Sequence, residues 1–179
     1  MLRYIRLFHL YVTAFVAPMF ILIAISGGLY LIGVKGEVTK TPLELPADAT
    51  LDFASRNLKE DVAALLAAQG VNHRFEYIRG GATSLVTRPT SRVNYEIGLV
   101  DQKLVAHRVK PNLQKTMIEL HKGHGPTLFK TYQKLVAISL LLIVLSGLWM
   151  GLNSKMLRNK AAITFGSGLV FFIVVAFLS

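Results

Sequence analysis

The feature that most constrains this chain is a long apolar run without a single charge, from residue 10 to residue 34. At about 1.5 Å per residue, a helix of that length crosses a hydrocarbon core of about 30 Å. A second apolar run covers residues 135–152, and a third covers residues 161–178. The chain is 53% hydrophobic and only 17% charged, whereas soluble domains carry about 25% charged residues. The sequence therefore predicts a membrane α-helical protein with three transmembrane helices.

The charge balance points to a membrane partner. Lys and Arg number 20 against 10 Asp and Glu, which gives a net charge of +10. On a soluble protein this excess would indicate nucleic acid, but basic residues also set membrane topology and bind anionic lipid. We therefore expect a lipid bilayer as partner and no nucleic acid. Cysteine is absent from the sequence, which excludes disulfides, zinc–thiolate sites and iron–sulfur clusters.

Basic residues beside the apolar runs predict the orientation of the helices. Arg3 and Arg6 precede the first run without an acidic neighbour. The loop between the second and third runs carries three basic residues, Lys155, Arg158 and Lys160. The positive-inside rule places both segments in the cytoplasm. We expect the inner (cytoplasmic) membrane of a bacterium, with the N-terminus cytoplasmic and both residues 35–130 and the C-terminal Ser179 periplasmic.

The segment between the first two runs predicts a small α+β domain. Residues 58–69 have apolar side chains at helical spacing, and Gly70 ends that helix. Four strand-like stretches follow, separated by turn residues: 74–79, 83–87, 93–99 and 104–109. Residues 41–46 contain two prolines and predict an extended linker. Such a domain is too small for a large catalytic cleft.

These patterns divide the chain into four parts. They are an N-terminal membrane helix (1–34), an extracytoplasmic domain (35–110), an interfacial segment with the second membrane helix (111–152), and a cytoplasmic loop with the third (153–179). Glycines at 123 and 125 and Pro126 predict a break before the second membrane helix. His121 and His124 would then share a short interfacial helix. Their spacing of three would point both side chains the same way.

The first two membrane helices share one pattern, a histidine near the start and a Ser-Gly pair near the end. His9 and Ser26-Gly27-Gly28-Leu29 mark the first helix, and His121 and Ser146-Gly147-Leu148-Trp149 mark the second. Because the two helices run in opposite directions, each histidine should lie beside the glycines of the other helix. Counting residues back along an unbroken second helix, however, places its histidine about 12 Å beyond the level of the first helix's serine.

This pattern resembles that of PepSY-associated transmembrane proteins. The motifs that carry the resemblance are Arg3-x-x-Arg6-Leu7-x-His9-Leu10 with its Ser-Gly-Gly-Leu ending, and Leu120-His121-Lys122-Gly123-His124-Gly125 with its Ser-Gly-Leu-Trp ending. The resemblance covers nearly the whole chain apart from the third helix, and it implies a PepSY-like extracytoplasmic domain. Larger relatives include membrane-bound reductases of ferric siderophores that hold b-type haem between helices. This chain is shorter than those relatives.

The same residues predict two haem b sites, one near each membrane face. Glycine leaves room for a haem plane or for close helix packing, and neutral imidazole is a usual axial ligand of haem iron. The candidate cofactor-binding residues are His9, His121 and His124 as iron ligands, with Ser26, Gly27, Gly28, Ser146 and Gly147 around them.

The number of axial ligands in the sequence does not decide whether the chain binds haem. Six-coordinate iron needs a second axial ligand, from a homodimer, a partner subunit, or a methionine such as Met19 or Met150. The alternative is structural: His9 would be an interfacial histidine, whereas His121 and His124 would contact lipid headgroups or cap a helix.

The sequence is compatible with three functions. The first is a redox-linked inner-membrane protein that passes electrons towards an extracytoplasmic metal or siderophore complex. The second is a non-catalytic accessory subunit or assembly factor of a larger respiratory or metal-handling complex. The third is a PepSY-type regulator that binds an envelope peptidase. No Walker loop, dinucleotide glycine motif or His-Glu-x-x-His motif is present, and the sequence does not decide whether the chain is an enzyme.

Overall fold

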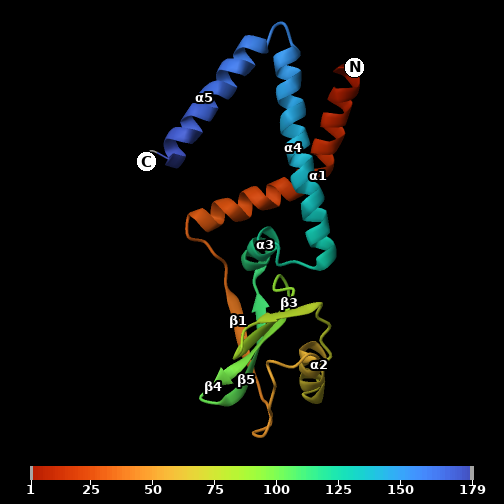
Figure 1. Ribbon diagram of the computed structural model, residues 1–179, viewed down its shortest axis with the longest axis vertical. Helices are drawn as coiled ribbons and strands as arrows, with labels where there is room; N and C mark the ends of the chain where they lie inside the picture. Colours follow the sequence, from red (N-terminus) through yellow and green to blue (C-terminus); the bar gives the residue numbers. More distant parts are fainter. Residues whose placement is uncertain (1, 178–179) are drawn as a thin grey trace. The chain divides into compact units, whose positions relative to one another are not determined.

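The computed structural model describes residues 2–177 and divides the chain into two compact units (Figure 1). One unit contains residues 1–19 and 134–179, and the other contains residues 20–133. The end of the third apolar run at residue 178 and the predicted periplasmic C-terminus at Ser179 lie outside the described residues.

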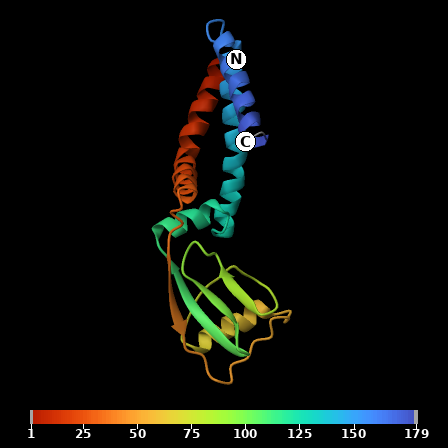
Figure 2. The ribbon, with the colours of Figure 1, turned by 90° about the vertical axis from the view of Figure 1, so that its left-hand side faces the viewer.

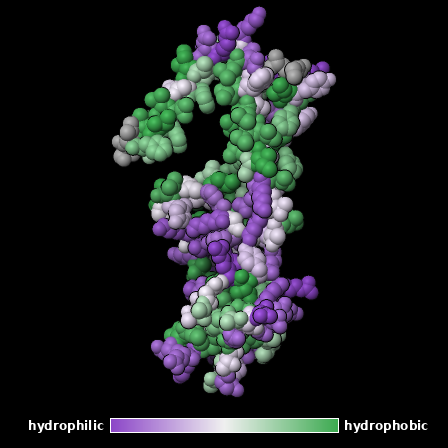
Figure 3. Space-filling view, in the orientation of Figure 1, coloured by the Kyte–Doolittle hydropathy of each residue, from purple (hydrophilic) through white to green (hydrophobic). Residues whose placement is uncertain are grey.

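Three helices are long and apolar enough to cross a membrane, which confirms the predicted number. They are α1 (Leu2–Leu31), α4 (Thr127–Asn153) and α5 (Arg158–Phe177). Most of their large apolar side chains face outward, and hydrophobic residues dominate the surface of α5 in Figure 3. Such exposure is costly in water but favourable in lipid.

The second unit contains a five-stranded antiparallel sheet with the order β1-β5-β4-β3-β2. Its elements are β1 (Val38–Leu43), α2 (Leu58–Ala68), β2 (Tyr77–Gly80), β3 (Ser84–Arg88), β4 (Asn94–Val100) and β5 (Lys103–Pro111). Helix α2 lies across one face of the sheet (Figures 1 and 2). The predicted helix and four strands are all found, with ends shifted by up to three residues. The separate antiparallel sheet domain is therefore confirmed.

Strand β1 corrects the expectation of a linker for residues 41–43, whereas residues 44–46 lie outside helices and strands. Its residues pair with β5 over the whole of its length, and Pro42 lies opposite His107. Proline favours the extended backbone that suggested a linker, and an edge strand tolerates its missing N–H because one side of the strand is unpaired. Local sequence showed that this segment is extended but could not show which strand it joins.

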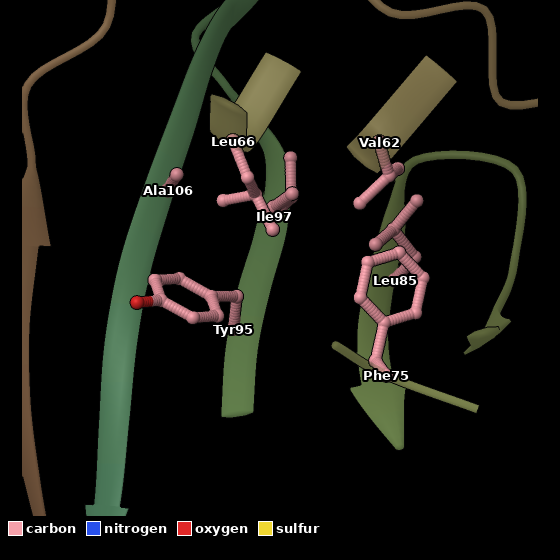
Figure 4. Packing of buried hydrophobic residues seen from close by; sticks show 7 residues of the cluster. All are labelled: Val62, Leu66, Phe75, Leu85, Tyr95, Ile97 and Ala106. Carbon is pink, nitrogen blue, oxygen red and sulfur yellow. The ribbon is translucent and has the colours of Figure 1, made fainter. Parts of the chain in front are cut away.

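The core of the sheet domain lies between α2 and the sheet. Val62 and Leu66 of α2 point towards Leu85, Ile97 and other buried residues of the strands (Figure 4). Both helix residues are at most 1% exposed. Their four-residue spacing places them on one side of α2, which explains why this short helix docks on the sheet.

A two-residue turn joins β4 to β5. Val100 pairs with Lys103, and the intervening Asp101 and Gln102 have φ values of 49° and 62°. Positive φ at both positions is the geometry of a type I′ hairpin turn, which matches the twist of the flanking strands. The turn predicted at these residues is therefore confirmed.

The predicted break before the second membrane helix is also found. A short helix α3 (Leu113–His121) is capped at its start by the Asn112 side chain, which accepts a hydrogen bond of 2.8 Å from the Lys115 backbone N–H. Gly123 has a φ of 74°, a conformation that costs glycine little. The chain then enters α4 at Thr127.

Candidate functional site

The first histidine–serine pair lies within the unit formed by residues 1–19 and 134–179. Nδ1 of His9 lies 2.9 Å from Oγ of Ser146, which is 3.0 Å from the carbonyl oxygen of Ile143. Gly147 follows the serine, and a Cβ at this glycine would lie 3.4 Å from Cε1 of His9. The antiparallel pairing expected from the sequence is therefore found for His9.

The second pair lies within residues 20–133 and repeats this arrangement. Nδ1 of His121 lies 3.0 Å from Oγ of Ser26, and that hydroxyl is 2.7 Å from the carbonyl oxygen of Leu22. Ser26 is 1% exposed. A Cβ at Gly27 would lie 3.2 Å from Cε1 of His121, whereas no described atom lies within 4 Å of a Cβ at Gly28. Of the two adjacent glycines, only Gly27 contacts the imidazole.

The hydrogen bonds around each serine indicate which nitrogen of a neutral imidazole carries the hydrogen. A serine hydroxyl has one hydrogen, and in each pair a backbone carbonyl of the same helix is within reach to accept it. When the hydroxyl donates to that carbonyl, its oxygen accepts a hydrogen bond from Nδ1–H of the histidine. We therefore assign the Nδ1–H tautomer to neutral His9 and His121. This tautomer leaves the Nε2 lone pair free, which is the state that binds a metal ion.

The position of His121 corrects the estimate made by counting along an unbroken helix. That estimate separates His121 from the level of Ser26 by about 12 Å, but the two side chains are hydrogen-bonded at 3.0 Å. The count fails because the histidine ends α3, a separate helix that precedes α4. The loop between them changes the chain direction, so the rise of a single helix does not apply.

The position of His124 corrects a second expectation. This residue lies in the loop after α3, beyond Gly123, and not on the helix that carries His121. Its Nδ1 is 2.7 Å from Oε2 of Glu119, whereas His121 bonds to a serine of α1. The positive φ of the glycine turns the backbone between the two histidines, so their side chains find different partners.

Glu119 joins α3 to the sheet domain. Its Oε2 accepts a hydrogen bond of 2.6 Å from the Thr90 hydroxyl, and Nζ of Lys115 lies 3.4 Å from its Oε1. Burial by itself raises the pKa of Glu119, but the hydrogen bonds from Thr90 and His124 and the charges of His124 and Lys115 outweigh it. The pKa of Glu119 is therefore lowered. The carboxylate stays ionised and holds α3 in place, and the sequence pattern did not reveal this role.

Two lysines flank Tyr30 close to the His121 pair. Nζ of Lys122 lies 5.1 Å from the centre of the Tyr30 ring, and Nζ of Lys35 lies 5.5 Å from it. A mainly apolar hollow there is lined by Ser26, Gly27, Tyr30, Ile118, His121 and Lys122. Cations over an aromatic ring are stabilised by its negative face. This end of the site can therefore accept an anionic group.

Two features near His9 and Ser146 are compatible with a flat hydrophobic ligand such as a porphyrin. No cluster of three or more His, Asp or Glu side chains with metal-binding geometry occurs among residues 2–177. The hydroxyl of Thr13 is buried without a hydrogen-bond partner in the described structure. It lies one helical turn after His9, on the same side of α1. An apolar groove beside Ser146 includes Phe8 and Trp149, as a flat hydrophobic ligand requires.

The candidate ligands Met19 and Met150 and the remaining histidines, His73 and His107, lie in different parts of the protein. Met19 is 3% exposed, and Met150 lies in α4. His107 is part of β5. His73 packs against the rings of Phe75 and Tyr95, and burial, with the charges of two nearby arginines, lowers its pKa. His73 therefore has a structural position in the sheet domain, and His107 lies on one of its strands.

No protein-family model, curated protein or solved structure matches this chain.

Proposed function

We propose that this protein is a b-type haem-binding electron carrier of the bacterial inner membrane. The observation that carries the proposal is the hydrogen-bond relay from imidazole Nδ1 to serine to backbone carbonyl, present at both His9 and His121. Axial histidines commonly donate Nδ1–H to a nearby acceptor, which orients the ring and raises the basicity of Nε2. The motif resemblance to PepSY-associated transmembrane proteins supports the same assignment.

The chain's own residues would bind and orient the haem. His9 and His121 present Nε2 as ligands, the two serines hold the rings, and Gly27 and Gly147 keep space beside them. Arg6, one turn before His9, and the lysines around Tyr30 supply positive charge for carboxylate groups. His124 remains a candidate third ligand, since its bond to Glu119 also uses Nδ1. Bound haem supplies one-electron redox chemistry.

We further propose that a second copy of the chain completes each site. Each histidine–serine pair contributes one imidazole, whereas a six-coordinate haem needs two axial ligands. A homodimer supplies a matching residue by symmetry, because the same surface of both subunits meets at a twofold axis. The orientation expected from the basic residues would place the sheet domain in the periplasm. An extracytoplasmic metal or siderophore complex could accept the electrons there.

The first test is a reduced-minus-oxidised absorption spectrum of the detergent-purified protein, together with a pyridine haemochrome assay and a measurement of its mass in solution. The proposal expects a b-type spectrum, near-integral haem per chain or per dimer, and a dimeric mass. A colourless and folded protein purified from haem-replete cells would reject it.

Single-residue variants assign the sites. His9→Ala and His121→Ala should each remove haem, and the doubly substituted chain should lose it all. His107→Ala is the matched control, because this histidine lies on a strand of the sheet domain and should leave the spectrum unchanged. Full haem content in both His9→Ala and His121→Ala would refute the ligand assignment even if the wild-type protein binds haem.

A second candidate function is favoured by the bare surface of α5. No residue of this helix is buried in the described structure, and no described atom lies within 4 Å of a Cβ at Gly166 or Gly168. Small residues on a membrane helix often mark contact with another helix, and these two glycines, two residues apart, lie on different sides of α5. The chain would then be an accessory subunit or assembly factor of a larger complex. Co-purification of a stoichiometric partner, lost in a Gly166→Leu/Gly168→Leu variant, would favour this function.

A further inference from the structure

A groove beside the free edge of the sheet takes no part in either histidine–serine pair. It lies between β2 and the segment that leads into α2, and it has a volume of about 350 Å³. Four apolar side chains line it: Phe53, Leu58, Ile78 and Leu85. This volume is within the range of ligand-binding clefts, and the four side chains give the groove an apolar floor.

The edge of β2 offers unpaired backbone groups to this groove. In the described residues β2 ends the sheet order, so no strand covers its outer side. The N–H of Gly81 donates to the carbonyl of Ser84 at 2.9 Å. Because the bonded pairs of an antiparallel ladder recur every second residue, Arg79 faces β3, while Ile78 and Gly80 direct their N–H and C=O groups outward.

The rim of the groove is positively charged. Arg56 and Lys59 line it and are both exposed, and neither Asp nor Glu is among its described lining residues. Arg79 of β2 is not among the lining residues. The groove thus combines a free strand edge, an apolar floor and two cations.

We propose that this groove binds an extended acidic segment of another protein, which adds a strand to β2. Backbone hydrogen bonds to Ile78 and Gly80 would supply affinity that is independent of sequence. Alternate side chains of the segment would be apolar and lie on the floor, while its carboxylates would pair with Arg56 and Lys59. This interaction does not depend on haem, so the two proposals can fail separately.

The test uses the full-length protein in nanodiscs of phosphatidylcholine alone, because a zwitterionic bilayer does not compete for the basic rim. The probe is a fluorescein-labelled peptide with the sequence Glu-Val repeated three times, and binding is followed by fluorescence anisotropy. Two control peptides replace Glu by Lys or carry a methyl group on every backbone nitrogen. The acidic peptide should bind with a dissociation constant below about 1 mM, and neither control should bind.

Two variants locate the peptide. Arg56→Gln/Lys59→Gln should weaken binding by roughly 2- to 30-fold, the range that two exposed ion pairs supply, and added salt should have a similar effect. Arg79→Gln is the matched control, since it removes one positive charge from β2 outside the groove, and it should bind as the wild type does.

The result that overturns the proposal is absence of binding by the acidic peptide at about 1 mM. Equal binding of the basic peptide would also overturn it, because the positive rim would then play no part. Equal binding of the N-methylated peptide would overturn it too, because the strand edge would then play no part. Equal weakening by Arg79→Gln and by the double variant would reject this groove as the site.

Discussion

Substitution of the glycine beside His121 separates a packing requirement from a general effect on helix stability. A Cβ at Gly27 would lie 3.2 Å from Cε1 of His121, whereas carbon atoms prefer a separation of about 3.5–4.0 Å. In Gly27→Ala the imidazole must therefore retreat by roughly 0.3 Å or more. The bond from Nδ1 to Ser26 Oγ, now 3.0 Å, would then exceed the usual upper limit of about 3.2 Å.

The adjacent glycine provides the matched control. Gly28 is in the same helix, and no described atom lies within 4 Å of its added Cβ. Both substitutions gain about 0.8–1 kcal/mol of helix propensity. Only Gly27→Ala weakens a hydrogen bond between helices, which is worth about 0.6 kcal/mol on average in a membrane protein and at most about 1.7. Gly27→Ala should therefore be less stable than Gly28→Ala by about 0.6–1.7 kcal/mol.

The assay is unfolding in mixed micelles of a mild detergent and sodium dodecyl sulfate, followed by circular dichroism for both variants and the wild type. If the proposed function holds, the Gly27→Ala variant should also show a changed haem spectrum, and Gly28→Ala should not. Equal stability of the two variants would refute the reasoning, because the position of His121 would then not depend on the absence of a side chain at Gly27.

Three further predictions concern α3 and the sheet domain. The pKa of Glu119 is lowered in the folded protein. The stability that its carboxylate contributes is therefore present above the unfolded pKa of about 4.5 and is lost as pH falls through the lower folded value. An acid titration of the free energy of unfolding should show this loss, and Glu119→Gln should remove the part of the loss that Glu119 causes. Leu66→Ala should destabilise the domain by about 2–5 kcal/mol in a denaturant titration, because it leaves a cavity in the core; a cost below about 0.5 kcal/mol would contradict the observed burial. Gln102→Gly should raise stability in the same assay by up to about 1 kcal/mol, since glycine adopts positive φ without strain; destabilisation would contradict the assigned turn geometry.

The sequence alone established the local features of this protein. Charge-free runs predicted the three apolar helices, because a helix across lipid must satisfy its backbone internally and present apolar side chains. Alternation and turn residues predicted the helix and four strands of the small domain. The matching histidine and Ser-Gly patterns of two antiparallel helices also predicted that each imidazole would lie beside glycines of the other helix, but not that Gly27 and not Gly28 contacts His121.

Tertiary structure decided the contacts between segments that are distant in sequence. The pairing of β1 with β5, the approach of His121 to Ser26 and the separate partner of His124 were not predictable from local pattern. Periodicity reports which side of an element is buried but carries no information about its long-range partner. One glycine turn after α3 redirects the chain. Because of that turn, two histidines three residues apart contact a serine of α1 in one case and a buried carboxylate in the other.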